Sequence, residues 1–261
     1  MADAHGFDEF VRIIARLRDP ERGCPWDLEQ SHRSIAKNMV EEAYEAVHAI
    51  ETDDIAELRD ELGDVLLQVV LQAQIGADAG EFTIDEVVSA ISEKIVRRHP
   101  HVFADGDAGT PGEVLANWDR IKSDERAEKG AGLLDSVPHS LPALMMAQGI
   151  SRKAVSAGFE WESLEGVWAK VHEELDELKA TEPGSPEAVD EIGDVLFTVV
   201  NLARKQGIDA ESALRATCTK FRRRWSEMEA AATAQGRSIA EMTLDEQESL
   251  WQQAKAGEEA T

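Results

Sequence analysis

The chain carries the same ordered set of motifs twice. An acidic segment, EEAYE, stands at residues 41–45 and is followed by ELGD at 61–64. The second half repeats this order, with EELDE at 173–177 and EIGD at 191–194. The apolar runs that follow, VLLQVVLQA and VLFTVVNLA, match nearly position by position. We therefore expect each half to fold into the same kind of unit, because a repeated sequence pattern is the signature of a repeated structure.

The pattern within each half is helical. Apolar residues recur at spacings of three and four, as in Val40, Ala43, Tyr44 and Val47, which places them on one face of a helix. Strand-like alternation is hard to find, so the predicted fold is all-α, built as tandem helical bundles. Predicted helices cover residues 7–18, 31–51, 54–79, 84–99, 111–128, 141–156, 163–181, 186–206, 210–234 and 244–256. Threonine–glutamate pairs and first-position prolines mark several starts: Thr83 with Glu86, Thr110 with Glu113, Thr243 with Glu246, Pro111 and Pro186.

One stretch separates the halves. Glycine and proline interrupt the helical pattern in GAGLLDSVPHSLP, residues 130–142. We predict a first domain over residues 1–130, a linker over 131–142 and a second domain over 143–261.

Charge and composition exclude several classes of protein. The chain has 52 acidic and 27 basic residues, a net charge of −25, which repels nucleic acid backbones and anionic lipids. No apolar run approaches the roughly 18 residues of a membrane span, and no secretory leader pattern opens the sequence. Cys24 and Cys218 form neither a CxxC pattern nor a disulfide framework. We therefore expect a cytoplasmic protein without a nucleic acid or membrane partner.

The repeated acidic motifs predict a cation site. Residues three apart share a helix face, so Glu42 and Glu45 point the same way, as do Glu61 and Asp64. A short connection near residues 51–54 makes the two helices antiparallel neighbours, so that four carboxylates converge. Such like charges need a cation, and all-oxygen ligation favours Mg²⁺, with Mn²⁺ as a substitute. The alternative is a solvated acidic face; we disfavour it because the motifs occur twice and lack lysine partners at i to i+4 spacing.

Basic residues and tryptophans are repeated as well. Basic side chains could hold phosphate oxygens, or could simply lie at solvated helix ends. The tryptophans could stack on a base or pack. The repeated sets are Lys94, Arg97 and Arg98 with Lys220, Arg223 and Arg224, and WDRIK at 118–122 with WQQAK at 251–255.

Taken together, these motifs resemble the MazG family of nucleoside triphosphate pyrophosphohydrolases in its two-copy form. The resemblance covers essentially the whole chain. It rests on EExxE followed by ExxD in both halves, and on LRDPERGCPWDLEQSH at 17–32, RRHPHVFAD at 97–105, SLPALMMAQ at 140–148 and GFEW at 158–161. It implies the all-α NTP pyrophosphatase fold, a homodimer, and Mg²⁺-dependent hydrolysis of nucleoside triphosphates to the monophosphate and pyrophosphate.

The resemblance also implies roles for individual residues. The implied metal ligands are Glu174, Glu177, Glu191 and Asp194 in the second half, and Glu42, Glu45, Glu61 and Asp64 in the first. The implied nucleotide contacts are Lys220, Arg224, Trp251 and Lys255, with Lys94, Arg98, Trp118 and Lys122 at the matching positions; Arg97, Arg223 and Lys170 are further candidates. The candidate general base is Glu41 or Glu173, or one of the ligands themselves. The segment EPGSPEAVD, before EIGD, departs from the family by lacking a lysine that some members place there.

Two alternatives stay open at this point. One is a base-selective dCTP or dUTP pyrophosphatase, and the other is a non-enzymatic acidic helical adaptor in a stress-response network. The sequence leaves open the preferred base and sugar, and which half is active.

Overall fold

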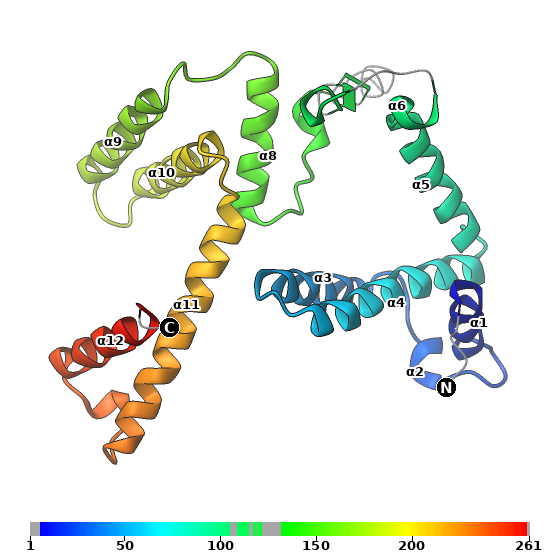
Figure 1. The fold of residues 1–261 in the computed structure, drawn as a ribbon, viewed down its shortest axis with the longest axis horizontal. Coiled ribbons are helices and arrows are strands. Elements are labelled where there is room, and N and C mark those ends of the chain that lie inside the picture. The colour runs from blue at the N-terminus through cyan, green and yellow to red at the C-terminus, as the bar shows by residue number, and fades with distance from the viewer. Residues whose placement is uncertain (1–5, 105–108, 115–116, 119, 122–131, 260–261) are drawn as a thin grey trace. The chain divides into compact units, whose positions relative to one another are not determined.

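The computed structural model describes residues 6–104, 109–114, 117–118, 120–121 and 132–259. Within these ranges every regular element is a helix, which confirms the all-α fold. The chain divides into two compact units, residues 1–122 and 123–261 (Figure 1). The division thus falls a few residues before the expected end of the first domain, next to residues outside the described ranges.

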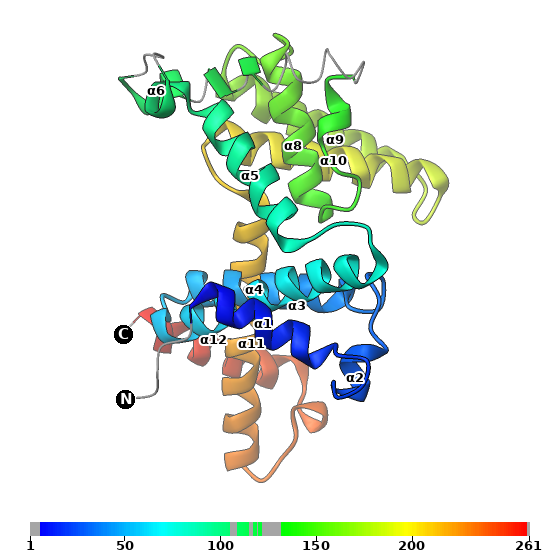
Figure 2. The same ribbon diagram turned by 90° about the vertical axis from the view of Figure 1, so that its right-hand side faces the viewer.

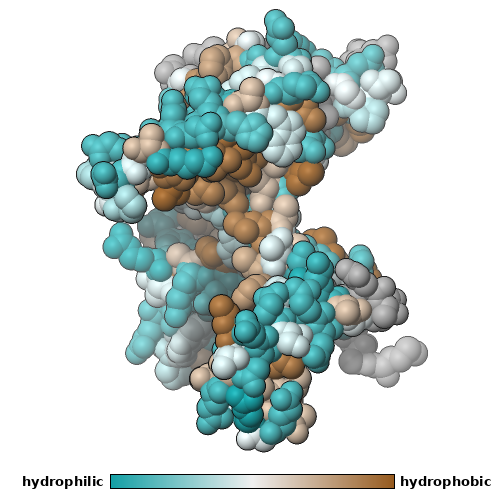
Figure 3. Space-filling model, turned by 90° about the vertical axis from the view of Figure 1, so that its left-hand side faces the viewer, coloured by the Kyte–Doolittle hydropathy of each residue, from teal (hydrophilic) through white to brown (hydrophobic). Residues whose placement is uncertain are grey.

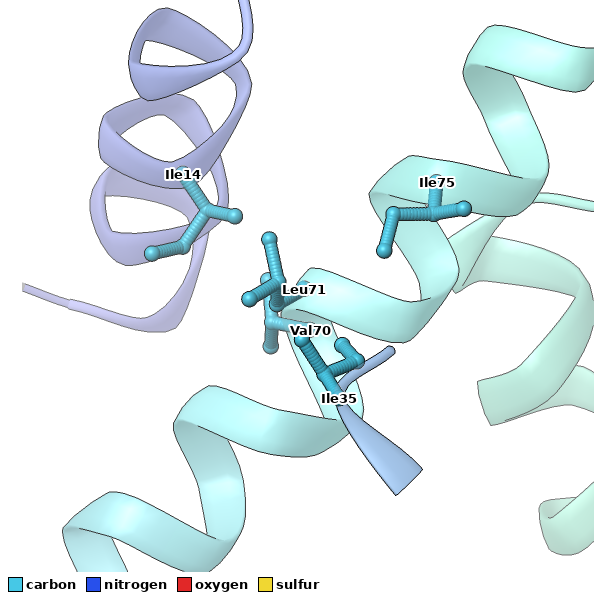
Figure 4. Packing of buried hydrophobic residues seen from close by; sticks show 5 residues of the cluster. All are labelled: Ile14, Ile35, Val70, Leu71 and Ile75. Atoms are coloured by element: carbon cyan, nitrogen blue, oxygen red, sulfur yellow. The ribbon is translucent and has the colours of Figure 1, made fainter. Parts of the chain in front are cut away.

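The first unit is built on a pair of long antiparallel helices. Its elements are α1 (Phe7–Leu17), α2 (Pro25–Leu28), α3 (Ala36–Glu51), α4 (Ile55–Ala79), α5 (Ile84–Arg98) and α6 (Pro100–Phe103). Helices α3 and α4 pack along one another, and α1 and α5 each pack on α4. Figure 4 shows the core where α1 meets α4 and the start of α3, formed by Ile14, Ile35, Val70, Leu71 and Ile75.

The second unit repeats this plan. Its elements are the 3₁₀ turn η1 (Leu134–Ser136), α8 (Ala143–Ser156), α9 (Leu164–Ala180), α10 (Pro186–Lys205), α11 (Ala210–Ala234), the 3₁₀ turn η2 (Ile239–Glu241) and α12 (Leu244–Glu259). Helices α9 and α10 pair as α3 and α4 do, and α8 packs on α10 as α1 packs on α4. One apolar cluster joins α9 to α10, and a second joins α11 to η2 and α12. The repeat predicted from the motifs is therefore present in the structure.

The predicted linker is partly packed. Val137 is buried, and it approaches α8 so closely that a Cβ added to Gly149 would lie 3.1 Å from Val137 Cγ1. Val137, which directly follows η1, therefore packs against α8 of the second unit.

Local hydrogen bonds explain where the helices begin. Thr83 and Glu86 form a capping box at the start of α5, and the same reciprocal bonds join Thr110 to Glu113 and Thr243 to Glu246. Pro186 occupies the first position of α10, as predicted.

Two details of the predicted helices differ from the structure. The helix predicted from residue 31 begins at Ala36, because the Ser31 and Ser34 hydroxyls each accept a hydrogen bond from the other's backbone N–H and hold a turn instead. The four-residue α2 and α6 are too short to show a periodic pattern. Of the helix predicted over 111–128, residues 111–114, 117–118 and 120–121 are helical, and the others lie outside the described ranges.

No helix among the described residues combines the length and the apolar character that a membrane crossing requires.

Candidate active site

A three-residue connection sets the carboxylates of α3 and α4 against each other. The Thr52 hydroxyl donates to the His48 carbonyl at the end of α3, and Asp53 adopts a left-handed φ of 55°. The Asp54 carboxylate then caps α4 by accepting from the N–H groups of Ala56 and Glu57. The chain reverses within this turn, so the acidic motifs of the two helices face one another, as expected.

In the first half, three of the four predicted ligands converge. Carboxylate oxygens of Glu42, Glu45 and Glu61 all lie within 4.8 Å of one another. Burial raises the pKa of Glu42 and of Glu61, and neighbouring carboxylates, including Asp64, raise both further. The fourth predicted ligand is thus within electrostatic reach of the group. Bringing these charges together costs free energy that a bound cation would offset.

The second half forms the equivalent cluster. Carboxylate oxygens of Glu174, Glu191 and Asp194 lie within 4.8 Å of one another, and Glu174 is buried. The fourth predicted ligand, Glu177, is hydrogen-bonded to Glu174, and this contact, followed by burial, raises the pKa of Glu177. Two helix pairs of the same design therefore each gather four acidic side chains.

One buried oxygen in each cluster has no hydrogen-bond donor. Glu61 Oε2 and Glu191 Oε2 are shielded from solvent and accept no hydrogen bond. The two residues occupy matching positions in the repeat. A buried carboxylate oxygen without a donor is costly, and a divalent cation would satisfy it. The donor set is all oxygen, which fits Mg²⁺ or Mn²⁺.

A lysine distinguishes the second cluster from the first. Lys170 Nζ lies 2.8 Å from Glu173 Oε1 and 2.8 Å from Glu174 Oε1, and these hydrogen bonds raise the pKa of the ammonium group. The expectation that the acidic motifs lack a lysine at i to i+4 spacing was therefore wrong for this half. The matching position in the first half is Asn38. The ammonium group of Lys170 thus provides a positive charge beside the carboxylates of the second cluster.

The remaining predicted contacts of the second half lie on α11 and α12. The guanidinium carbon of Arg224 lies 5.3 Å from the centroid of the Trp251 ring, and the Phe221 ring lies 5.0 Å from it. The side chains of Lys220, Arg223 and Lys255 are exposed. Structure and sequence therefore agree in placing basic and aromatic groups side by side here. We call α11 and α12 together the second arm.

The matching residues of the first half follow α4 in the same order. Lys94 and Arg97 are exposed on α5, and Arg98 is half-buried. The Trp118 ring meets the His99 ring edge to face at 4.9 Å. Lys122 lies outside the described residues.

In one chain, the second arm lies apart from the carboxylates of its own half. Helix α12 packs on the outer part of α11, whereas α11 packs on α8 near its start. Figures 1 and 2 both show α12 away from α9 and α10. Within the described part of the second unit, the predicted ligands therefore lie together on α9 and α10, and Arg224 and Trp251 lie together on the second arm.

Two features of this region were missed from the sequence. Phe221 and Trp225 stack on the arm with ring centroids 6.2 Å apart, and their four-residue spacing was a readable signal. Gln148 is buried at the base of the arm; the motif SLPALMMAQ contains it, but periodicity gives no hint of its partners.

The chain is similar to several known proteins. The model of the MazG nucleotide pyrophosphohydrolase domain matches the chain at residues 30–103 and again at 163–228, so both carboxylate clusters fall inside a match. The nucleoside triphosphate pyrophosphohydrolase of Escherichia coli K12 is 45% identical over 96% of this chain and 97% of its own length. The nucleoside triphosphate pyrophosphohydrolase/pyrophosphatase MazG of Thermotoga maritima is 42% identical, over 97% of each chain. YabN of Bacillus subtilis, whose function is uncharacterized, is 47% identical over 97% of this chain and 52% of its own length.

Proposed function

Because the chain belongs to the MazG family of nucleotide pyrophosphohydrolases, we propose that it hydrolyses nucleoside triphosphates to monophosphate and pyrophosphate with the help of Mg²⁺. The observation that carries this proposal is the pair of matching carboxylate clusters, each with a buried oxygen that lacks a donor. A solvated acidic face would not require such a buried oxygen, whereas a bound cation would use it.

The chain's own residues divide the work. Glu174, Glu191 and Asp194 would hold the cation in the second half, and Glu42, Glu45 and Glu61 in the first, with Glu177 and Asp64 beside them. When bound, Mg²⁺ offsets the phosphate charge and polarises the phosphorus that water attacks.

We propose Glu173 or Glu41, or one of the metal ligands, as the general base that takes the proton of an attacking water. Glu173 and Glu41 each precede the first ligand of their cluster in the sequence. Lys170 orients Glu173 through a 2.8 Å hydrogen bond. Arg224 and Lys220 would then hold the phosphate oxygens as charge moves onto the departing pyrophosphate.

A homodimer is part of the proposal. The outer face of α10 exposes an apolar stripe at helical spacing: Val189, Ile192, Leu196 and Val199, with exposed fractions between 44% and 65%. Leu62 and Leu66 repeat it on α4. Figure 3, which faces the side where α9 and α10 lie, shows hydrophobic surface open to solvent among hydrophilic regions. An exposed apolar stripe of this kind indicates a surface that is buried against a partner. A second copy of the chain has the same stripe, and the two stripes can pack against each other across a twofold axis.

The dimer also suggests how the two groups of site residues meet. The second arm of one copy would reach the carboxylates of the other. An equimolar mixture of Glu191→Gln and Lys220→Ala/Arg224→Ala chains should then recover up to about a quarter of wild-type activity, because random pairing gives half the dimers one intact site of two. If the mixture stays inactive while the wild-type protein is active, each chain supplies its own arm.

The function itself is tested by product release from a panel of nucleoside triphosphates. With Mg²⁺, we expect monophosphate and pyrophosphate from several bases. Cleavage of one base alone would identify a selective pyrophosphatase, and no cleavage would favour the adaptor. The matched control is Glu162→Gln, an exposed glutamate before α9, which should keep wild-type activity.

A further inference from the structure

A buried glutamine holds the base of the second arm. Gln148 lies on α8 and is only 3% exposed. Its side-chain amide donates to the Ile208 carbonyl over 2.9 Å, and its side-chain oxygen accepts from the Ala210 N–H over 2.9 Å. Ile208 and Ala210 flank the point where the chain leaves α10 and enters α11. The donor and the acceptor of the Gln148 side-chain amide therefore both bind the connection between α10 and α11.

Among the described residues, a second polar contact ties this connection to α8 more weakly than Gln148 does. Ala210 is the first residue of α11, where backbone N–H groups lack helical partners, and Asp209 caps only the N–H of Ser212. Arg152 reaches Asp209 at 3.8 Å, but both side chains are about half exposed, so this ion pair contributes little. Gln148 is thus the main polar contact that fixes α11 against α8.

Because α11 is long, a small change in its angle at the base displaces the nucleotide-contacting residues further along the helix by a much larger distance. An α-helix rises about 1.5 Å per residue, so Arg224 stands about 21 Å along α11 from Ala210. A tilt of about 10° at the base moves Arg224 by about 3–4 Å by this geometry. Phosphate contacts tolerate far less, since misplacement by about 1 Å already lowers rates strongly.

The first unit holds the equivalent connection differently. Phe82 packs against Gly76, where an added Cβ would lie 2.9 Å from the ring. The His32 ring stacks on Phe82 at 5.7 Å, and His32 Nε2 lies 3.0 Å from Glu81 Oε2. The first unit's connection therefore makes none of its described contacts through Gln148.

We propose that Gln148 is a positioning residue for the second nucleotide site, which sets the direction of α11 and so places Lys220 and Arg224. This inference rests on the proposed function, and it holds whether the arm serves its own chain or a second copy.

The test compares Gln148→Leu, which keeps similar bulk without hydrogen bonds, with Arg152→Ala on the same helix. For Gln148→Leu we expect the KM for nucleoside triphosphate to rise at least tenfold per folded molecule, with Mn²⁺ affinity, measured by calorimetry, within twofold of wild type. Gln148→Glu should recover part of the loss only at acidic pH, where a protonated carboxyl can donate to the Ile208 carbonyl and accept from the Ala210 N–H, because the ionised group buries an unpaired charge. Arg152→Ala should leave KM within twofold. An unchanged KM in folded Gln148→Leu would overturn the proposal.

A second measurement needs no turnover, so it separates this inference from the proposed function. One spin label is attached to Cys218, which is exposed on α11, and the other to a cysteine introduced by Glu162→Cys. The chain also carries Cys24→Ser and is diluted with unlabelled chain. The distance between the two labels then reports the direction of the second arm. We expect Gln148→Leu, or Gln148→Glu if the leucine variant does not fold, to broaden or shift the distance distribution. An unchanged distribution would contradict the inference, whereas wild-type protein that lacks turnover would contradict only the proposed function.

Discussion

Lys170 should stabilise the second carboxylate cluster when no metal is bound. The perturbation is Lys170→Met, which keeps most of the length and removes the charge and the donors. Lys170 Nζ lies 2.8 Å from Glu174, whose side chain is 7% exposed, while the lysine side chain is 33% exposed. At that separation two unit charges attract by about 1.5 kcal/mol in water and about 6 kcal/mol at an effective dielectric constant of about 20.

The net effect is smaller than the attraction. Exposed pairs contribute about 0–1 kcal/mol, and losing one partner of a buried pair costs about 3–5 kcal/mol. This pair lies between the two cases, so we expect Lys170→Met to lower the free energy of unfolding by about 2 kcal/mol. For a chain of this size the melting temperature should fall by about 4–8 °C.

The assay is thermal unfolding in EDTA and in saturating Mg²⁺. The variant should lose stability mainly in EDTA and recover much of it with Mg²⁺, because the metal replaces the missing positive charge. Lys179→Met is the matched control, since Lys179 pairs with Asp176 on the same helix at the same 2.8 Å, with both side chains about three-quarters exposed. It should change stability by less than about 0.5 kcal/mol. Equal melting temperatures for Lys170→Met and Lys179→Met in EDTA would show that the contact of Lys170 with Glu174 adds no stability.

Three further predictions follow from other parts of the chain. Hydrogen bonds from Arg237 and Thr243 lower the pKa of Glu246 to about 2, so Glu246 stabilises the fold above its ordinary pKa near 4.5, and this contribution is lost as the pH falls toward 2. The melting-temperature gap between wild type and Glu246→Gln should therefore be constant from pH 5 to 7 and close below pH 4.5; a gap unaffected by acid would exclude this cause. Asn38→Lys should raise the metal-free melting temperature by about 0.5–2 °C, because it gives the first cluster a cation at the position of Lys170; no rise would mean that the two clusters differ in geometry. Trp251→Ala should raise KM about tenfold, in line with the loss of base stacking, with Trp251→Phe close to wild type; equal KM values for all three proteins would leave Trp251 a packing residue.

The sequence predicted the carboxylate clusters because their geometry is local. Three-residue spacing sets a common helix face, and a three-residue connection at Thr52–Asp54 forces the next helix to return alongside. The pair of Lys170 with Glu174 was equally local, at i to i+4, so that signal was present in the sequence and was overlooked.

The direction of the arms could not be predicted in this way. It depends on the contact between Gln148 and the connection that leads into α11. Ile208, in this connection, lies 60 residues after Gln148 in the sequence. Helical periodicity places Lys220 and Arg224 on one helix but says nothing about the angle at which that helix leaves its neighbours. The turn at Ser31 and Ser34 was missed for a related reason, because side-chain hydroxyls there compete with helical hydrogen bonds.

We propose that the two carboxylate clusters carry out Mg²⁺-dependent pyrophosphohydrolysis. The most direct measurement is release of monophosphate and pyrophosphate by wild type, Glu61→Gln, Glu191→Gln and the double variant, each with Mg²⁺ and with EDTA. Glutamine keeps the shape and removes the charge, so loss of rate reports loss of the metal site. We expect wild-type turnover to require Mg²⁺, at least one single variant to lose most of that turnover, and the double variant to have none. Turnover in EDTA, or full turnover by the folded double variant, would contradict it.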